Sequence, residues 1–165
     1  MHRLPEAEPS CSKTSRVLAV DDEPLFGEFV ARVLQQAGFQ VTSAPGGDAA
    51  IASVERFGPP DLLLTDFKMP RMDGDELAAR LRRSTPDLKV LYLTGFAQAL
   101  FSNRSVLWEG EAFLEKPCSP SAIVEAVSML LYDRLDPQAP VAAQPVAAMR
   151  TLLAGLAKNP SRDVV

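Results

Sequence analysis

The chain has 165 residues, enough for one domain with a full hydrophobic core and a tail. Hydrophobic residues make up 47% of it and charged residues 23%, as in globular proteins, and the formal net charge of −4 argues against a nucleic-acid binder. No apolar run reaches the roughly 18 residues of a membrane span, and the N-terminus lacks a secretory signal, so we expect a cytoplasmic protein without membrane contact.

Residues 1–15 contain acids and prolines but no apolar run, and we expect them to form a disordered leader. From Arg16 on, short apolar runs alternate with segments whose apolar residues recur at helical spacing. In chain order this pattern predicts a strand at 16–20, a helix at 24–39, a strand at 40–44, a helix at 47–58, a strand at 61–65, a helix at 75–84, strands at 89–94 and 111–116, and a helix at 119–135. The last helix has Ser119 as its expected N-cap and Pro120 at its first position.

Two stretches do not fit this alternation. Residues 97–110 predict a short helix with an irregular end. Residues 133–165 form a Pro/Ala-rich tail, in which "APVAAQPVAA" (139–148) is typical of an extended linker. Residues 149–158 have apolar residues at helical spacing and predict a short helix, which either frays, lies on its own domain or binds a partner.

Strands that alternate with helices indicate an α/β fold, a doubly wound five-stranded parallel sheet with helices on both faces. The run "DLLLT" (61–65) is apolar on both faces, as expected of a strand covered on both sides. Sites in such sheets form at the carboxyl ends of the strands. Asp21, Asp66, Thr94 and Lys116 each end a different predicted strand, so we expect their side chains to meet at one edge.

Three carboxylates in this set, those of Asp21, Asp22 and Asp66, would repel one another unless a cation lies among them. Mg²⁺ prefers oxygen ligands and often binds one or two carboxylates together with a phosphate. Lys116 would add a positive charge suited to a phosphate oxygen, and the Thr94 hydroxyl would donate to another. Asp66 is then the candidate nucleophile, because an aspartate can take a phosphoryl group as an acyl phosphate.

Four motifs, "VDDEP" (20–24), "LLLTDFKMPRMDG" (62–74), "LTG" (93–95) and "FLEKP" (113–117), follow one another along the chain. Together they resemble the bacterial two-component response-regulator receiver domain of the chemotaxis-regulator type, over residues 16–132. The resemblance implies a flavodoxin-like sheet of strand order 2-1-3-4-5. It also implies that Asp66 accepts a phosphoryl group from a phosphohistidine on a sensor histidine kinase or a histidine phosphotransfer protein.

The resemblance further assigns roles around the phosphoacceptor. By position, Asp21 and Asp22 match the acidic pair that holds Mg²⁺, Asp66 is the third carboxylate, and the backbone carbonyl of Lys68 falls where the family supplies another metal ligand. The Lys68 side chain, two residues after Asp66, lies at a position that tunes dephosphorylation in the family.

A second group of matched residues belongs to the family's conformational switch. Thr94 and Lys116 match the residues that contact the phosphoryl group, Phe113 matches the aromatic switch position, and Pro117 matches the proline that often follows the lysine through a cis bond. Phosphorylation in the family draws in the threonine hydroxyl and lets the aromatic ring turn inward. This reshapes the face made by the fourth helix, the fifth strand and the fifth helix, which is also a candidate homodimer surface.

We expect no DNA-binding domain in the tail, which is short and not basic. The interpretation is a phosphoacceptor signalling domain that acts through a downstream protein partner, as a single-domain regulator or a phosphorelay element. Apart from its own phosphotransfer and autodephosphorylation, it is not an enzyme.

Three alternatives remain. The first is a phosphorylation-independent pseudo-receiver, which the intact acidic, threonine and lysine positions disfavour. The second is a Mg²⁺-dependent phosphohydrolase, against which Lys68 counts because such enzymes usually carry an aspartate there. The third is a flavin-binding flavodoxin relative, in which "DDEPLFGE" (21–28) would repel the phosphate.

Overall fold

The structure is a computed structural model that describes residues 14–95 and 107–132. Its elements are β1 (Arg16–Val20), α1 (Pro24–Gln36), β2 (Gln40–Ala44), α2 (Gly47–Phe57), β3 (Leu62–Asp66), α3 (Gly74–Arg82), β4 (Lys89–Thr94), β5 (Glu111–Glu115) and α5 (Pro120–Tyr132). Every strand and helix expected in this part is present, with ends that shift by a few residues. The predicted leader up to residue 13, most of the predicted helix in 97–110 and the tail from 133 on lie outside the described residues.

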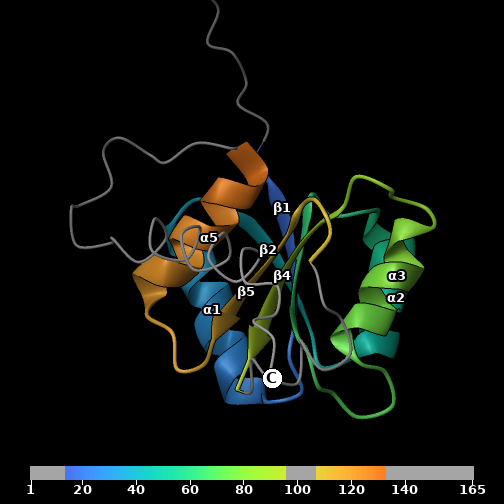
Figure 1. Cartoon of the computed structure of the whole chain (residues 1–165), viewed down its shortest axis with the longest axis horizontal. Coiled ribbons are helices and arrows are strands. Elements are labelled where there is room, and N and C mark those ends of the chain that lie inside the picture. The colour runs from blue at the N-terminus through green and yellow to red at the C-terminus, as the bar shows by residue number, and fades with distance from the viewer. Residues whose placement is uncertain (1–13, 96–106, 133–165) are drawn as a thin grey trace, which may run out of the picture.

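The five strands form one parallel sheet in the order β2-β1-β3-β4-β5, which confirms the predicted fold class and strand order. Figure 1 shows α1 and α5 on one face of this sheet and α2 and α3 on the other. Parallel strands need crossover connections, and among the described residues α1, α2 and α3 serve as the crossovers from β1 to β2, from β2 to β3 and from β3 to β4.

The register of the sheet determines which residues share its carboxyl edge. Val20 pairs with Thr65, Asp66 pairs with Leu93, and Thr94 pairs with Glu115. The ends of β1, β3, β4 and β5 therefore lie side by side, and the groups that follow them leave the sheet at one edge, as the sequence predicts.

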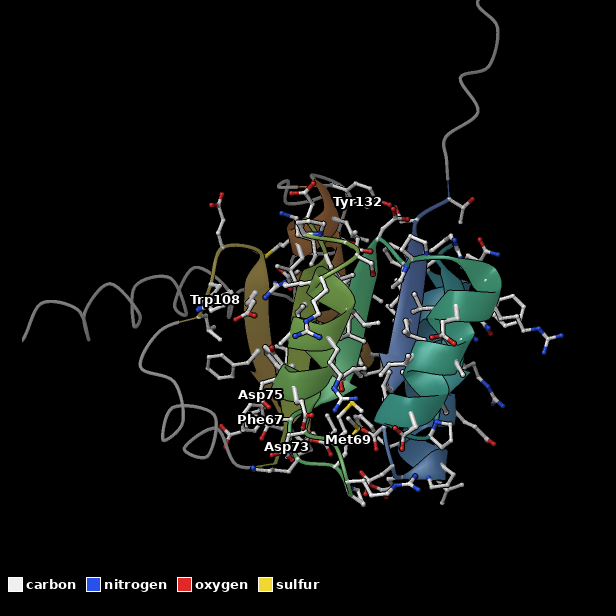
Figure 2. All side chains as sticks on the ribbon, turned by 90° about the vertical axis from the view of Figure 1, so that its right-hand side faces the viewer. Phe67, Met69, Asp73, Asp75, Trp108 and Tyr132 are labelled. Atoms are coloured by element: carbon white, nitrogen blue, oxygen red, sulfur yellow. The ribbon has the colours of Figure 1, made fainter. Side chains whose placement is uncertain are left out.

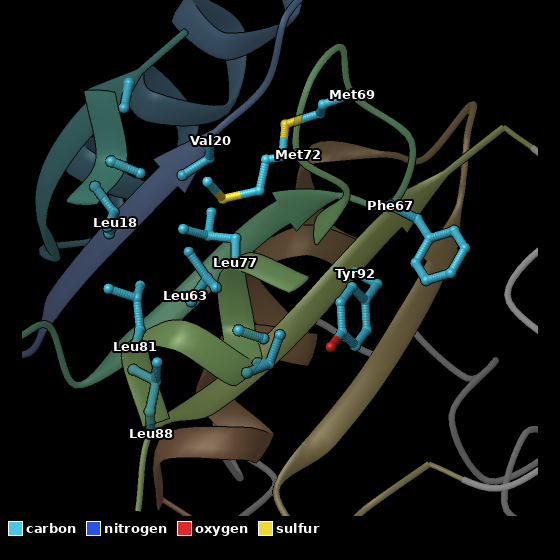
Figure 3. Packing of buried hydrophobic residues seen from close by; sticks show 14 residues of the cluster. Leu18, Val20, Leu63, Phe67, Met69, Met72, Leu77, Leu81, Leu88 and Tyr92 are labelled. Atoms are coloured by element: carbon cyan, nitrogen blue, oxygen red, sulfur yellow. The ribbon is translucent and has the colours of Figure 1, made fainter. Parts of the chain in front are cut away.

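Two hydrophobic clusters cover the sheet, one on each face. Leu63 belongs to the cluster under α2 and α3, while its neighbours Leu62 and Leu64 belong to the cluster under α1 and α5. All three leucines are buried, so the prediction of a strand covered on both faces is confirmed. Figure 3 shows the first cluster, in which Phe67 lies beside Tyr92 with its ring edge-on at a centroid distance of 5.8 Å.

The helix ends follow local rules. The Ser119 hydroxyl accepts a hydrogen bond from the Ala122 N–H at 3.2 Å, which confirms the predicted N-cap of α5. Helix α1 ends at Gln36, and Gly38, the glycine expected to stop it, adopts a φ of 91° that turns the chain out of the helix. No helix in the described ranges is long and apolar enough to cross a membrane.

A buried ion pair joins α3 to the amino end of β5. The Glu111 side chain is fully buried and its Oε1 accepts a hydrogen bond from Arg82 Nη1. The same carboxylate accepts hydrogen bonds from the Tyr92 hydroxyl at 3.4 Å and from the Trp108 backbone N–H at 3.1 Å. The Arg82 guanidinium also lies over the exposed Trp108 ring, 5.9 Å from its centroid. The charges of this pair were not singled out from the sequence.

Candidate functional site

Three carboxylates gather at the carboxyl edge of the sheet. Oxygen atoms of Asp21, Asp22 and Asp66 all lie within 4.8 Å of one another. Asp21 follows β1 and is buried, with an exposed fraction of 5%; its Oδ1 accepts a hydrogen bond from the Glu23 N–H at 2.8 Å, which fixes the carboxylate at the start of α1. Asp22 is exposed, and Asp66 at the end of β3 is half-buried. The structure thus brings together the three acids that the sequence predicts to meet.

The Lys116 ammonium lies among these acids. Its Nζ donates to Asp21 Oδ2 at 2.8 Å and lies 3.4 Å from Asp66 Oδ2. The Lys116 backbone N–H donates to the Thr94 carbonyl oxygen at 2.8 Å, which continues the β4–β5 hydrogen bonding by one residue. The peptide bond between Lys116 and Pro117 is cis, the geometry that the resemblance implies.

Among the described residues, burial and the charges of Asp21, Asp66 and Lys116 set the electrostatics of the site. Burial raises the pKa of Asp66 above its ordinary value; the Lys116 ammonium opposes this shift, and the Asp21 carboxylate adds to it. Burial by itself would lower the pKa of Lys116, but its hydrogen bond to Asp21 and the charges of Asp21 and Asp66 raise it instead. One lysine therefore does not fully offset three carboxylates, and an oxygen-coordinated divalent cation fits this donor set.

The loop after Asp66 contacts the second carboxylate oxygen of the phosphoacceptor candidate, Oδ1. The Lys68 N–H donates to Asp66 Oδ1 at 3.4 Å, while Lys68 Nζ donates to Asp73 Oδ2 at 2.7 Å on the exposed surface. This hydrogen bond raises the pKa of Lys68. Figure 2 shows Phe67, Met69 and Asp73 together at this end of the molecule. The Lys68 carbonyl oxygen stays a predicted metal ligand.

Gly74 allows α3 to begin directly against the end of β3. A Cβ at this position would lie 2.3 Å from the Asp66 carbonyl oxygen and 3.0 Å from the Thr65 Cγ2 atom. The Gly74 N–H donates to the Phe67 carbonyl oxygen at 2.9 Å, which closes the loop. The glycine of the "MDG" motif is therefore needed for close backbone approach to the phosphoacceptor residue.

We expect Gly74→Ala to lower the free energy of unfolding by about 1–3 kcal/mol, because the methyl group meets backbone atoms that cannot turn aside. Gly47→Ala is the control for a side-chain contact: its methyl group would lie 2.5 Å from Met72 Sδ and 3.0 Å from Met72 Cβ and Cγ, and it should cost less because a methionine side chain can shift whereas the Asp66 backbone cannot. Urea unfolding followed by circular dichroism measures both. If both variants lost the same free energy of unfolding, the close approach of Gly74 to the Asp66 backbone would not explain the effect.

The predicted switch residues occupy the neighbouring strands. Thr94, the last residue of β4, is buried with an exposed fraction of 3%. Phe113 on β5 is half-buried, pairs with Tyr92 in the register and packs against the cluster under α2 and α3. Thr94 thus lies at the edge that carries the acids, and Phe113 lies further back in the sheet; their switch roles stay predictions.

One neighbour of the site was missed from the sequence. The Phe26 ring lies under the Lys116 ammonium, with Nζ 4.2 Å from the ring centroid. Phe26 falls in the helix predicted at 24–39, and no role at the site was predicted for it. Its place in the first turn of that helix, directly after the Asp21–Asp22 pair, was the available signal, because this turn stays next to the edge that carries the two acids.

Comparison with known proteins agrees with this arrangement. The family model of the response regulator receiver domain matches residues 17–128. The response regulator receiver protein CpdR of Brucella abortus is 34% identical over 116 residues, which cover 70% of this chain and 96% of that protein. The sensor kinase CckA of the same organism is 32% identical over 127 residues, 76% of this chain but only 13% of the kinase.

A solved structure gives the same result. The response regulator TrrA of Thermotoga maritima, determined in complex with Mg²⁺ and BeF, superimposes with a TM-score of 0.61 at 30% identity, covering 72% of this chain and 100% of that one. The family match extends over more than half of the chain and includes every strand of the sheet. The chain therefore belongs to the response-regulator receiver domains of two-component signalling.

Proposed function

We propose that this receiver domain accepts a phosphoryl group on Asp66 in a Mg²⁺-dependent reaction. The donor is a phosphohistidine of a sensor histidine kinase or of a histidine phosphotransfer protein. The observation that carries the proposal is the placement of Asp66: its carboxylate ends a buried strand, within 4.8 Å of two further acids and 3.4 Å from the Lys116 ammonium. A carboxylate that served only as a helix cap would not require two neighbouring carboxylates and an ammonium group.

In the proposed step a carboxylate oxygen of Asp66 attacks the phosphorus atom of the donor. The new P–O bond forms as the P–N bond to the imidazole breaks, and the electron pair of that bond stays on the histidine nitrogen. Lys116 offsets the negative charge on the phosphoryl oxygens, and Thr94 donates its hydroxyl hydrogen to one of them. The product is an acyl phosphate, which water hydrolyses to restore Asp66.

Asp21, Asp22, Asp66 and the Lys68 carbonyl oxygen would hold the metal ion. All four are oxygen ligands, as Mg²⁺ requires, and carboxylate oxygens of the three acids lie within 4.8 Å of one another. When bound, Mg²⁺ would supply charge neutralisation to the phosphoryl oxygens.

The output of the proposed modification is a change in protein contacts. Thr94 moves toward the phosphoryl group and Phe113 turns inward, which reshapes the surface around β5, α5 and the segment before β5. That surface is the proposed site for a downstream protein partner or a second copy of the chain. We propose that this domain acts through protein contacts, as a response regulator or as a phosphorelay element.

The test is intact-mass analysis after incubation with acetyl phosphate, with and without Mg²⁺, for the wild type and for Asp66→Asn. We expect a gain of one phosphoryl group that needs Mg²⁺, is lost with acid or hydroxylamine treatment, and is absent from the variant. The substitution keeps the size of the side chain and removes the nucleophilic charge.

A folded, Mg²⁺-binding protein that gains no mass would contradict the proposal. The chain would then act as a phosphorylation-independent interaction module, the second candidate function. If Asp66→Asn still gained the mass of one phosphoryl group, the modification would lie on another residue.

A further inference from the structure

The Lys116 ammonium rests against an aromatic face as well as against carboxylates. The Phe26 ring centroid lies 4.2 Å from Nζ, within the range of a cation–π interaction. Phe26 belongs to α1 and is half-buried against the cluster under α1 and α5. The Phe29 ring lies against it at a centroid distance of 5.9 Å. The contacts with this cluster and with Phe29 therefore fix the position of the Phe26 ring independently of the lysine.

The two carboxylates that hold Lys116 both change partners in the proposed reaction. Asp21, which accepts the shorter hydrogen bond at 2.8 Å, is also a proposed metal ligand. Asp66, at 3.4 Å, loses its negative charge when it becomes an acyl phosphate. An ammonium on a flexible four-carbon stem would lose its position at this moment if carboxylates alone held it.

The Phe26 ring does not take part in those exchanges. It offers the metal ion and the phosphoryl group no ligand and carries no proton that titrates, so its attraction for the ammonium is the same before and after phosphotransfer. An interaction of this kind, partly shielded from water, changes an equilibrium or a rate constant by about threefold to tenfold.

We propose that Phe26 is a positioning residue for the phosphotransfer. Its ring keeps the Lys116 ammonium next to Asp66 while the carboxylates exchange partners. Phe26 acts through Lys116 and does not itself touch the phosphoryl group. The inference rests on the proposed function, which it deepens by naming the group that fixes the lysine.

The first experiment observes the contact without any phosphorylation. In protein labelled with ¹³C-lysine, the ε-methylene signal of Lys116, assigned by its loss in Lys116→Arg, should be shifted upfield by the ring current of Phe26. We expect this shift in the Mg²⁺-free protein and again with Mg²⁺ and beryllofluoride. Phe26→Leu should move the signal to the position of the other lysines. An identical position in the wild type and in Phe26→Leu would overturn the proposal.

The second experiment measures the rate of phosphorylation by acetyl phosphate at saturating Mg²⁺. Phe26→Leu should slow it about threefold to tenfold, with the Mg²⁺ dissociation constant unchanged, while Phe26→Tyr, which keeps an aromatic face, should retain the wild-type rate. Phe57→Leu is the matched control: it removes a ring that lies 5.0 Å from the Arg56 guanidinium carbon on the exposed surface of α2. This control should leave the rate unchanged.

A wild-type rate in Phe26→Leu, or a rate in Phe26→Tyr as low as in Phe26→Leu, would overturn the proposal and leave the proposed function intact. A wild-type protein that gains no phosphoryl group would contradict the proposed function itself, and this inference with it. If the NMR spectrum of the backbone amides shows that Phe26→Leu is not folded, Phe26→Met replaces it, because methionine fills a similar space without an aromatic face.

Discussion

Lys116→Met should destabilise the Mg²⁺-free protein by about 3 kcal/mol. The substitution removes the cation that Asp21 and Asp66 share, and the Asp21 side chain is only 4% exposed, so its carboxylate would stay in a poorly hydrated place without that charge. Added Mg²⁺ should return most of the lost stability, because the three acids still offer a set of oxygen ligands. Urea unfolding in EDTA and in millimolar Mg²⁺ measures both effects.

Lys68→Met provides the control for this prediction. It also removes one lysine charge near the acids, but its partner Asp73 and the ammonium itself are exposed, at 35% and 55%. Exposed pairs of this kind contribute about 0–1 kcal/mol. If Lys116→Met unfolded at the same urea concentration as Lys68→Met in EDTA, the lysine between the acids would have no special role in stability.

Arg82→Met should lower the free energy of unfolding by about 3–5 kcal/mol, since it removes a positive partner of a carboxylate whose side chain is fully buried. The guanidinium also donates to the Leu88 carbonyl oxygen, at 3.3 Å from Nε and 3.0 Å from Nη2, which ties the end of α3 to the start of β4. Thermal and urea unfolding of the variant would measure the loss.

A double-mutant cycle separates the charge from the packing. In Arg82→Met/Glu111→Gln the amide oxygen can replace Oε2 and accept from the Trp108 N–H, while the amide NH2 replaces Oε1 and can donate to the Tyr92 hydroxyl oxygen. The side chain then carries no charge, so a large part of the lost stability should be recovered. Arg80→Met is the surface control, because its ion pair with Glu76 is half-exposed. Additive losses in the cycle would contradict a coupled buried pair.

The sequence was sufficient where the physics is local or repeats along the chain. The run 61–65, apolar on both faces, predicted a covered strand, and a parallel sheet then required Asp66 to leave the edge beside the ends of the neighbouring strands. Ser119 and Pro120 predicted the start of α5 because a cap depends on a few adjacent residues.

The contacts that were missed depend on side chains far apart in the sequence. Phe26 and Lys116 are separated by ninety positions, so the place of Phe26 near the acids indicates that it lies at this edge but not that its ring meets the Lys116 ammonium. Arg82 and Glu111 were not singled out from the sequence, because burial of a charge follows from how α3 meets β5 rather than from either segment alone.

An intrinsic fluorophore lies beside the ion pair between α3 and β5. The chain has a single tryptophan, Trp108, whose indole lies over Arg82 and whose backbone bonds to Glu111. Glu111 contacts Tyr92, and Tyr92 contacts Phe67, the residue next to Asp66. We therefore expect a rearrangement at the acids to change the emission of the indole, so that the fluorescence of unlabelled protein follows phosphorylation and its decay in real time. An emission that phosphorylation leaves unchanged would contradict this coupling.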